Sequence, residues 1–261
     1  MSPAQNSIMS YGQSKFFWVI AIFMVIFGIN FNIFFLAIMG NFGRILKNEE
    51  LKTYIALCLC ATAAIAIANL GVYENVGECI RSAFFHVSAT MSTTGFVTAE
   101  FTAWSSFAQT VIALLMVIGA CAGSTAGGLK ISRLIIVAKS AVRELRHTRR
   151  PNSVNAVRLD GSVVKDETVR AVSSYVCIYV IVIAVSTLLL SFDGYSFETN
   201  FGVSLTTVNN VGPSIGEIGA FGSLASYSYF SKLVMCFNML LGRLELMPML
   251  ILFSPRTWKR G

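Results

Sequence analysis

Residues 119–128 read GACAGSTAGG and interrupt an apolar stretch that extends from 104 to 143. Four of these ten residues are glycines, and glycine destabilises a helix by up to about 1 kcal/mol per position relative to alanine. The flanking sequences VIALLMVI and ISRLIIVAKS are typical of helices. The whole stretch is far longer than the roughly 20 residues that a helix needs to cross a membrane. We therefore predict one long helix that is broken in the middle of a membrane.

The composition of the 261-residue chain also indicates a membrane protein. Hydrophobic residues make up 55% of the sequence and charged residues only 13%, against about 25% charged residues in an average soluble domain. So few charges cannot cover the surface of a soluble protein. The composition excludes a cytosolic globular enzyme, a disordered chain and a nucleic-acid-binding module, despite the formal net charge of +7. The six cysteines form no CxxC pair, so neither a zinc site nor a disulfide framework is expected.

Four further apolar segments are long enough to span a membrane: 17–41, 52–73, 168–192 and 225–253. Together with the broken helix they predict five transmembrane helices. Sixteen of the 20 Lys and Arg residues lie in the segments 42–52, 130–170 and 254–261. Loops rich in Lys and Arg face the cytoplasm, so we place these three segments in the cytoplasm and the N-terminus outside.

Two shorter segments, 77–97 and 196–214, lie between spans whose flanks face the outer side. Each begins with a semi-apolar helical stretch and ends in Thr, Asn and Gly. This order predicts re-entrant loops, because irregular backbone at membrane depth is tolerated only where it is buried or lines a watery cavity. An offset of 117 residues places Gly95 on Gly212 and superimposes the flanking spans without gaps. We therefore predict an all-α integral membrane protein that repeats a helix–pore-loop–helix unit.

The repeats divide the chain into four parts. Residues 1–51 contain the last helix of an incomplete repeat, and residues 52–150 form a first pore repeat with filter loop 92–96 and gating break 119–128. A cytoplasmic linker at 151–167 follows. Residues 168–261 form a second pore repeat with filter loop 209–213. The unpaired first span favours a truncated piece over two chains that complete one pore.

Both predicted loops carry the residue types of an ion-selectivity filter. They read Ser92-Thr93-Thr94-Gly95-Phe96 and Asn209-Asn210-Val211-Gly212-Pro213. A dehydrated monovalent cation needs carbonyl or hydroxyl oxygens in place of its water shell, and glycine permits the positive φ that turns carbonyls inward. The C-terminal end of each pore helix adds a partial charge of about −0.5. The alternative is an ordinary polar loop with a turn. The occurrence of two such loops in register favours the filter over this alternative.

Four motifs in this sequence resemble those of the Trk/Ktr potassium-uptake family, in membrane subunits of the TrkH and KtrB type. They are Thr93-Thr94-Gly95-Phe96, Asn209-Asn210-Val211-Gly212-Pro213, Ala122-Gly123-Ser124-Thr125-Ala126-Gly127-Gly128-Leu129-Lys130 and Leu241-Gly242-Arg243-Leu244-Glu245. The resemblance covers nearly the whole chain. It implies a pore of four repeats that transports K⁺ without an organic cofactor, with filter oxygens from Thr93, Thr94, Gly95, Asn210, Val211 and Gly212. With only two filter loops, this chain resembles the C-terminal half of such a subunit.

The resemblance also implies a location and partners. It indicates a multi-pass protein of the bacterial plasma (inner) membrane that docks a cytosolic nucleotide-binding regulatory subunit. The basic run 143–150 could contact that subunit or anionic lipid headgroups. No nucleotide motif occurs in this sequence, so nucleotide sensing would belong to the partner. A homodimer or a missing N-terminal half would supply the other two loops, and no nucleic acid partner is expected.

The glycine-rich break is predicted to gate the pore below the filter. The offset of 117 places Ala126 on Arg243, so this arginine should lie at the depth of the break. A charge in mid-membrane costs about 2.5–3.5 kcal/mol and usually faces a cavity or a partner. Our hypothesis is that Arg243 repels K⁺ and holds the break closed, with Gly123, Ser124, Thr125, Gly127 and Gly128 as the gating residues. The alternatives are an arginine that reaches the interface and an ion pair with Glu245.

Three functions remain in competition. The first is a K⁺-conducting pore subunit gated from the cytoplasm. The second is an ion-coupled secondary transporter, because broken helices also line the midplane sites of such proteins. The third is a non-conducting scaffold or truncated fragment. Repeats that run in the same direction favour the pore. An enzyme is not expected, because the sequence offers no metal cluster, nucleophile–base pair or phosphate-binding loop.

Overall fold

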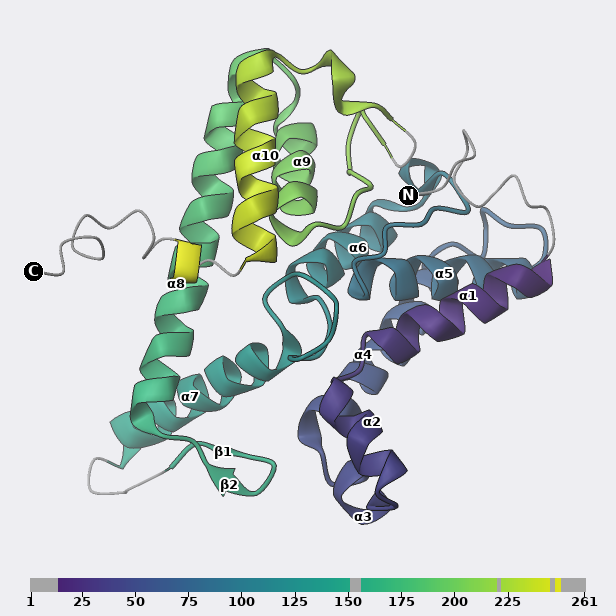
Figure 1. Ribbon diagram of the computed structural model, residues 1–261. Helices are drawn as coiled ribbons and strands as arrows, with labels where there is room; N and C mark the ends of the chain where they lie inside the picture. Colours follow the sequence, from purple (N-terminus) through teal and green to yellow (C-terminus); the bar gives the residue numbers. More distant parts are fainter. Residues whose placement is uncertain (1–13, 151–155, 220–221, 245–246, 250–261) are drawn as a thin grey trace, which may run out of the picture.

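Helices make up most of the structure, a computed structural model that describes residues 14–150, 156–219, 222–244 and 247–249 (Figure 1). The helices are α1 (Ser14–Phe27), α2 (Phe31–Ile38), α3 (Phe42–Ile45), α4 (Glu49–Ala68), α5 (Val76–Met91), α6 (Ser106–Ile118), α7 (Ile131–Arg149), α8 (Asp166–Leu190), α9 (Phe197–Asn209) and α10 (Tyr229–Arg243). A small antiparallel hairpin, β1 (Arg158–Leu159) and β2 (Ser162–Val163), lies between α7 and α8. The predicted all-α class suits lipid, where helices satisfy their own backbone hydrogen bonds.

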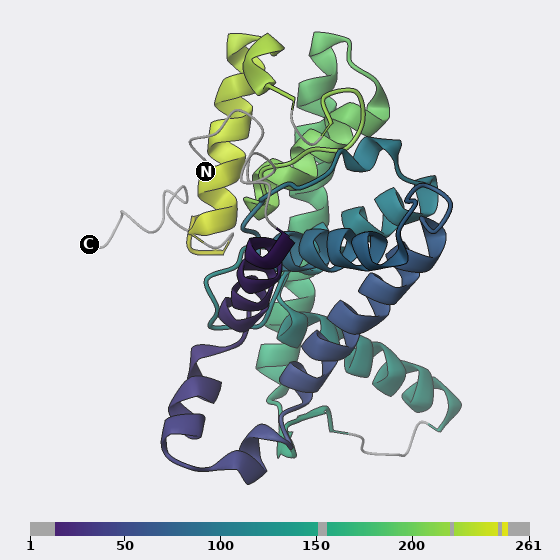
Figure 2. The ribbon, with the colours of Figure 1, turned by 90° about the vertical axis from the view of Figure 1, so that its right-hand side faces the viewer.

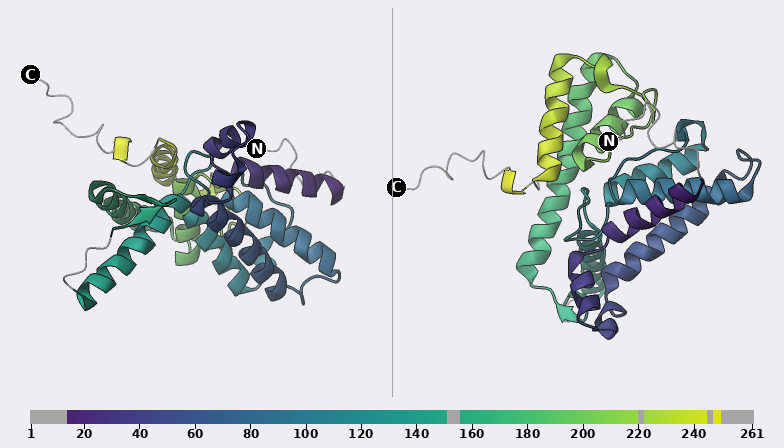
Figure 3. Two further views of the ribbon diagram at one scale, coloured as in Figure 1. Left: turned by 90° about the horizontal axis from the view of Figure 1, so that it is seen from below. Right: turned by 45° about the vertical axis from the view of Figure 1, so that its right-hand side comes forward.

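Two groups of helices repeat the same order of elements (Figure 1). In the first group α4 is followed by the shorter α5, an irregular loop and α6, and in the second α8 is followed by α9, a loop and α10. The short helix of each group packs against its neighbours, α5 against α1 and α4, and α9 against α8 and α10. Figure 3 shows both groups from further directions; they meet where α6 contacts α9 and α7 contacts α8. This order matches the predicted repeat unit.

Two described helical stretches are long and apolar enough to cross a membrane, α4 and the stretch Asp166–Asp193 that contains α8. The pair of α1 and α2 is a third candidate if it counts as one bent span, and α6 is a shorter apolar helix. The chain is thus an all-α membrane protein. The number of five spans stays a prediction, since 250–253 and the basic segment 254–261 lie outside the described residues.

The first span differs from the single helix expected over 17–41, because α1 and α2 meet at an angle of 92° (Figures 1 and 2). A Cβ atom on Gly28 would lie 2.2 Å from Tyr54 Oη, and this hydroxyl donates to Val25 O at 3.0 Å. Asn30 caps α2, and its side chain accepts from the N–H two residues later at 2.9 Å. Because tyrosine and asparagine satisfy backbone groups that a helix end leaves unpaired, the chain can turn here.

The gap-free offset between the repeats is wrong beyond the filter loops. α8 begins 117 positions after α4, but α10 begins 123 positions after α6. The second repeat therefore has a longer connection between its filter loop and its last helix. Connections tolerate insertions more readily than the helices that they join, so the extra residues lie in the loop and shift α10 relative to the offset of 117. With the insertion counted, Arg243 corresponds to Ala120 at the start of the break and not to Ala126.

Polar contacts hold together the end of the molecule where basic residues gather. Lys139 of α7 forms an ion pair with Glu49 of α4, and a second ion pair joins α7 to α8. Asp160, in the β1–β2 turn, accepts a hydrogen bond from the Glu49 N–H at 2.7 Å. Within its described part, the predicted linker 151–167 therefore contains a structured hairpin that contacts the start of α4.

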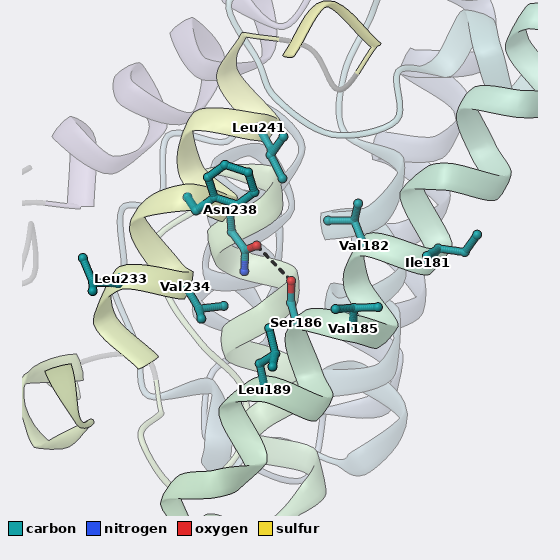
Figure 4. Close-up of a pocket in the computed structure, with 10 residues that line it drawn as sticks. Ile181, Val182, Val185, Ser186, Leu189, Leu233, Val234, Asn238 and Leu241 are labelled. Atoms are coloured by element: carbon teal, nitrogen blue, oxygen red, sulfur yellow. Dashed lines mark hydrogen bonds between the residues drawn. The ribbon is translucent and has the colours of Figure 1, made fainter. Parts of the chain in front are cut away.

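An apolar groove with a volume of about 410 Å³ lies between α8 and α10 (Figure 4). Among the residues that line it, Ser186 Oγ donates to Asn238 Oδ1 at 2.8 Å. Asn238 Nδ2 in turn donates to Thr207 Oγ1 of α9 at 3.4 Å. Interhelical hydrogen bonds of this kind contribute about 0.6–2 kcal/mol each in membranes. This buried polar chain therefore links the three helices of the second repeat.

We expect Gly28→Ala to destabilise the protein, because the new methyl group would overlap Tyr54. Overpacking of this kind costs about 1–3 kcal/mol and should lower the midpoint of thermal unfolding in detergent micelles. Adding Tyr54→Phe removes the nearest atom and should recover part of the loss. Gly71→Ala is the control, since no atom lies within 4 Å of that Cβ position. Equal midpoints for Gly28→Ala and Gly71→Ala would contradict this account of the bend.

Candidate functional site

The first filter loop leaves the C-terminal end of α5 in an unusual conformation. Thr93 has a φ of 51° and Gly95 a φ of 70°. The N–H groups of Thr94 and Gly95 both donate to Ala89 O, at 3.0 and 3.3 Å. A β-branched residue with positive φ is rare and persists only where its surroundings hold it in place. The turn at Thr93 is therefore imposed by the packing of the loop.

The second filter loop makes the same backbone turn in the same register. Asn210 has a φ of 55° and Gly212 a φ of 114°, each 117 positions after a left-handed residue of the first loop. The Val211 N–H donates to Thr206 O at 3.0 Å, and the Gly212 N–H donates to Thr206 Oγ1 at 2.8 Å. The sequence offset therefore holds within the filter loops, although it fails after them.

The two filter loops touch each other. A Cβ atom on Gly95 would lie 1.9 Å from Val211 O and 3.0 Å from Pro213 Cδ, and one on Gly212 would lie 3.9 Å from Gly95 Cα. The loops that follow the partially negative C-terminal ends of α5 and α9 therefore meet at Gly95 and Val211. Such a place suits a dehydrated cation. The fold thus brings together both sets of predicted filter residues, Thr93, Thr94, Gly95, Asn210, Val211 and Gly212; their role as ion ligands stays a prediction.

The glycine-rich break separates α6 from α7, between Ile118 and Ile131. Its returning arm is tied to the end of α6, because the N–H groups of residues 129–131 donate to the carbonyls of Val117, Ile118 and Ala120 at 3.0–3.1 Å. A Cβ atom on Gly119 would lie 2.5 Å from Gly127 O. The two arms of the break therefore pack backbone to backbone, which explains its glycines.

The break lies against both filter loops. The Gly127 N–H donates to Thr93 Oγ1 of the first loop at 3.0 Å. A Cβ atom on Gly127 would lie 2.3 Å from Asn209 O, at the start of the second loop. The same glycine thus contacts both repeats. A displacement of Gly127 would therefore break its hydrogen bond to Thr93 and its contact with Asn209.

Arg243 lies at the end of α10 and reaches the break. Its Nη1 donates to Thr125 O at 2.9 Å, and Lys130 Nζ donates to the neighbouring Ala126 O at 2.7 Å. Arg243 thus contacts the break, whereas its depth in the membrane and its gating role stay predictions. Glu245, the alternative ion-pair partner, lies outside the described residues.

A polar cavity with a volume of about 150 Å³ lies beside the break. Its wall combines the backbone of the break with three cations and an aromatic ring, contributed by residues 124–128, Lys130, Arg133, Tyr175, Gly242 and Arg243. The Arg133 guanidinium lies 4.0 Å above the centre of the Tyr175 ring. The predicted gating residues from Ser124 to Gly128 therefore face a small, positively charged space.

Sequence reasoning missed the polar side chains that support these loops. Thr206 accepts from the second filter loop with both its carbonyl and its hydroxyl, and Glu50 of α4 accepts from the break. The only signal for Glu50 was an acidic pair at the start of an apolar span. His86 is buried in α5, with its ring nitrogens 2.9 Å from Ser82 O and 3.2 Å from Ala99 O.

A family model described as "TrkH: Cation transport protein" matches residues 1–260. The chain belongs to the TrkH family. It is 30% identical over 244 residues to the Trk system potassium uptake protein TrkH of Salmonella typhimurium, which covers 92% of this chain and 50% of the relative. It is 28% identical over 260 residues to the Trk system potassium uptake protein TrkI of Halomonas elongata, covering 98% of this chain and 53% of the relative.

The TrkH fold is shown by a solved relative as well. The crystal structure of the potassium transporter TrkH from Vibrio parahaemolyticus superimposes with a TM-score of 0.90 at 28% identity, covering 99% of this chain and 56% of that chain. The resemblance noted in the four motifs is confirmed, and the TrkH family is one of transport proteins, not enzymes. The chain spans about half the length of the curated relatives that it matches.

Replacing Gly95 tests the contact between the filter loops. Gly95→Ala and Gly40→Ala both place alanine at a φ near 70°, but only Gly95 has a backbone oxygen in the way. A left-handed alanine costs about 1–2 kcal/mol and a steric overlap adds about 1–3 kcal/mol. We therefore expect a clearly larger fall in the thermal midpoint for Gly95→Ala. Equal falls would mean that the two loops do not touch as described.

Proposed function

We propose that this chain forms part of a K⁺-conducting pathway, as a pore-forming subunit of a potassium uptake system. The observation that supports it best is the contact of the two filter loops at Gly95 and Val211, with the break packed against both. The relatives bear the names of potassium uptake proteins and of a potassium transporter. The proposal extends that activity to a chain that spans about half their length.

In this proposal the filter is made of backbone. The carbonyls of Thr93, Thr94, Gly95, Asn210, Val211 and Gly212 replace part of the water shell of K⁺, and the ends of α5 and α9 add negative potential. The side chains of two of these residues are engaged elsewhere: Thr93 Oγ1 accepts from Gly127, and Asn210 Nδ2 donates to Met239 O at 3.0 Å. K⁺ is the transported substrate, and no organic cofactor takes part.

The break acts as the gate. Within the break, Gly127 lies directly against both filter loops, and Arg243 holds Thr125 O from the second repeat. A guanidinium at this point repels a passing cation and also fixes the loop that blocks its way. Opening then means that the break leaves the filter, and its glycines give it the backbone freedom to do so.

The proposal includes a membrane location and partners for the pore. The protein lies in a bacterial inner membrane. The exposed basic end of α7, with Arg146, Arg149 and Arg150, faces the cytoplasm and contacts anionic lipid or a nucleotide-binding regulatory subunit. Two filter loops cannot encircle an ion, so the remaining loops come from a second copy or from a separate N-terminal half.

Growth at limiting K⁺ tests the proposed pathway. Expressed in a bacterium without its own K⁺ uptake systems, the full chain is expected to restore growth and K⁺ accumulation. Gly95→Ala should abolish both, because the filter loops can no longer meet, whereas Gly40→Ala should keep them. Membrane insertion is checked for all three by immunoblotting of washed membranes. Failure of the inserted unaltered chain to conduct would contradict the proposal for this chain alone.

Arg243→Ala tests the gate. Hydrogen bonds to charged groups contribute about 1.5–3 kcal/mol, so the loss should raise basal K⁺ flux by about tenfold or more. Arg44→Ala removes an exposed arginine from α3 and should leave the flux unchanged. Equal flux in the unaltered protein and Arg243→Ala, at matched expression, would contradict the gating role of Arg243.

A further inference from the structure

Glu50 is a buried carboxylate that reaches the break from α4. It is the second residue of that helix and only 5% exposed. Its Oε1 accepts two backbone hydrogen bonds, from the Ala122 N–H at 2.6 Å and from the Ser132 N–H at 3.2 Å. Burying a carboxylate is costly unless hydrogen bonds compensate it, and these two backbone donors do so.

The two donors lie on different sides of the flexible glycines. Ala122 belongs to the break, whereas Ser132 lies in the first turn of α7, whose N-cap residue Lys130 makes no capping hydrogen bond with its side chain. The first turn of a helix exposes unpaired N–H groups and favours a negative charge. Glu50 therefore supplies from another helix the cap that α7 lacks, and the same oxygen fastens the break to it.

Glu50 and Arg243 hold the same short loop with opposite charges. Glu50 accepts from the backbone N–H of residue 122, and Arg243 donates to the backbone carbonyl of residue 125. They come from different repeats, α4 and α10. Between them the break also exchanges backbone hydrogen bonds with the bend of α1 and α2, from the Cys121 N–H to Gly28 O at 3.1 Å and from the Phe31 N–H to Gly123 O at 3.2 Å.

We propose that Glu50 is a positioning residue of the gate, an anionic latch that keeps the break closed from the first repeat as Arg243 does from the second. This inference rests on the proposed gating function of the break. Movement of residues 122–128 away from the filter breaks the bond to Ala122 but can leave the bond to Ser132 in place. The N-terminus of α7 then stays fixed to α4 while the loop swings away.

Three variants separate the acceptor role of Glu50 from its charge. Glu50→Ala removes the acceptor, and Glu50→Gln keeps an oxygen that can accept both N–H groups. Glu49→Ala is the matched control, because it removes the same side chain one residue earlier, where it pairs with Lys139 at the surface. We expect Glu50→Ala to raise basal K⁺ flux by about tenfold, as the loss of a charge-assisted bond implies. Glu49→Ala should leave the flux near the unaltered value. Glu50→Gln should give an intermediate flux, because neutral hydrogen bonds are about half as strong as charge-assisted ones.

Native cysteines give a second readout that is independent of ion flux. Cys121 lies in the break and is fully buried, and Cys79 is equally buried in α5. Labelling with N-ethylmaleimide, located by mass spectrometry, should increase at Cys121 in Glu50→Ala and stay low at Cys79. Labelling of both cysteines would show general loosening of the fold and contradict a specific latch.

The outcomes distinguish the inference from the proposed function. If Arg243→Ala raises flux and Cys121 labelling but Glu50→Ala changes neither, the break gates the pore and the latch is wrong. If neither variant changes flux or labelling, the proposed gating function of the break is wrong, and the proposed role of Glu50 is wrong as well. A Glu50→Gln variant that leaks as much as Glu50→Ala would contradict the hydrogen-bonding role of Glu50.

Discussion

Close approach of backbone to backbone governs how the two repeats fit together at Gly95 and Gly127, and how α9 and α10 pack within the second repeat at Gly242. A Cβ atom at any of the three would lie within 2.3 Å of a carbonyl oxygen, those of Val211, Asn209 and Val208 respectively. At each of these three contacts a carbonyl oxygen lies against the backbone of a glycine, with no side chain between them. The absence of side chains at Gly95 and Gly127 allows the repeats to meet, and carbonyl oxygens are the ligands that the proposed filter needs.

The two repeats also share their hydrophobic cores. Val211 and Ile215 from the second filter loop pack into the core around α4, α5 and α6. Leu129, at the end of the break, packs with Tyr179 and Leu241 in the core around α8, α9 and α10. The second filter loop and the end of the break are therefore packed into hydrophobic cores. Val211 of the second filter loop contributes to the core of the first repeat, and Leu129 contributes to the core of the second.

Much of this fold could be predicted from the sequence, because lipid leaves few choices. Apolar length gave the long helices, glycines gave the break, and the register of Gly95 with Gly212 located both filter loops. The bend at Gly28 could not be predicted, because it depends on Tyr54, which is distant in the sequence. The role of Glu50 could not be predicted for the same reason. Its partners are backbone N–H groups more than 70 residues away, and every residue type other than proline offers such a group.

Shared cores have a consequence for how the chain is made. Synthesis runs from the N-terminus, and the first repeat emerges long before Val211 and Ile215 exist to fill its core. Until then its apolar interior is incomplete, as is typical of intermediates that expose hydrophobic surface and misassemble. The ribosome must therefore deliver both repeats to the bilayer before either can reach its final packing. The first repeat therefore reaches its final packing only after Val211 and Ile215 have been synthesised and inserted.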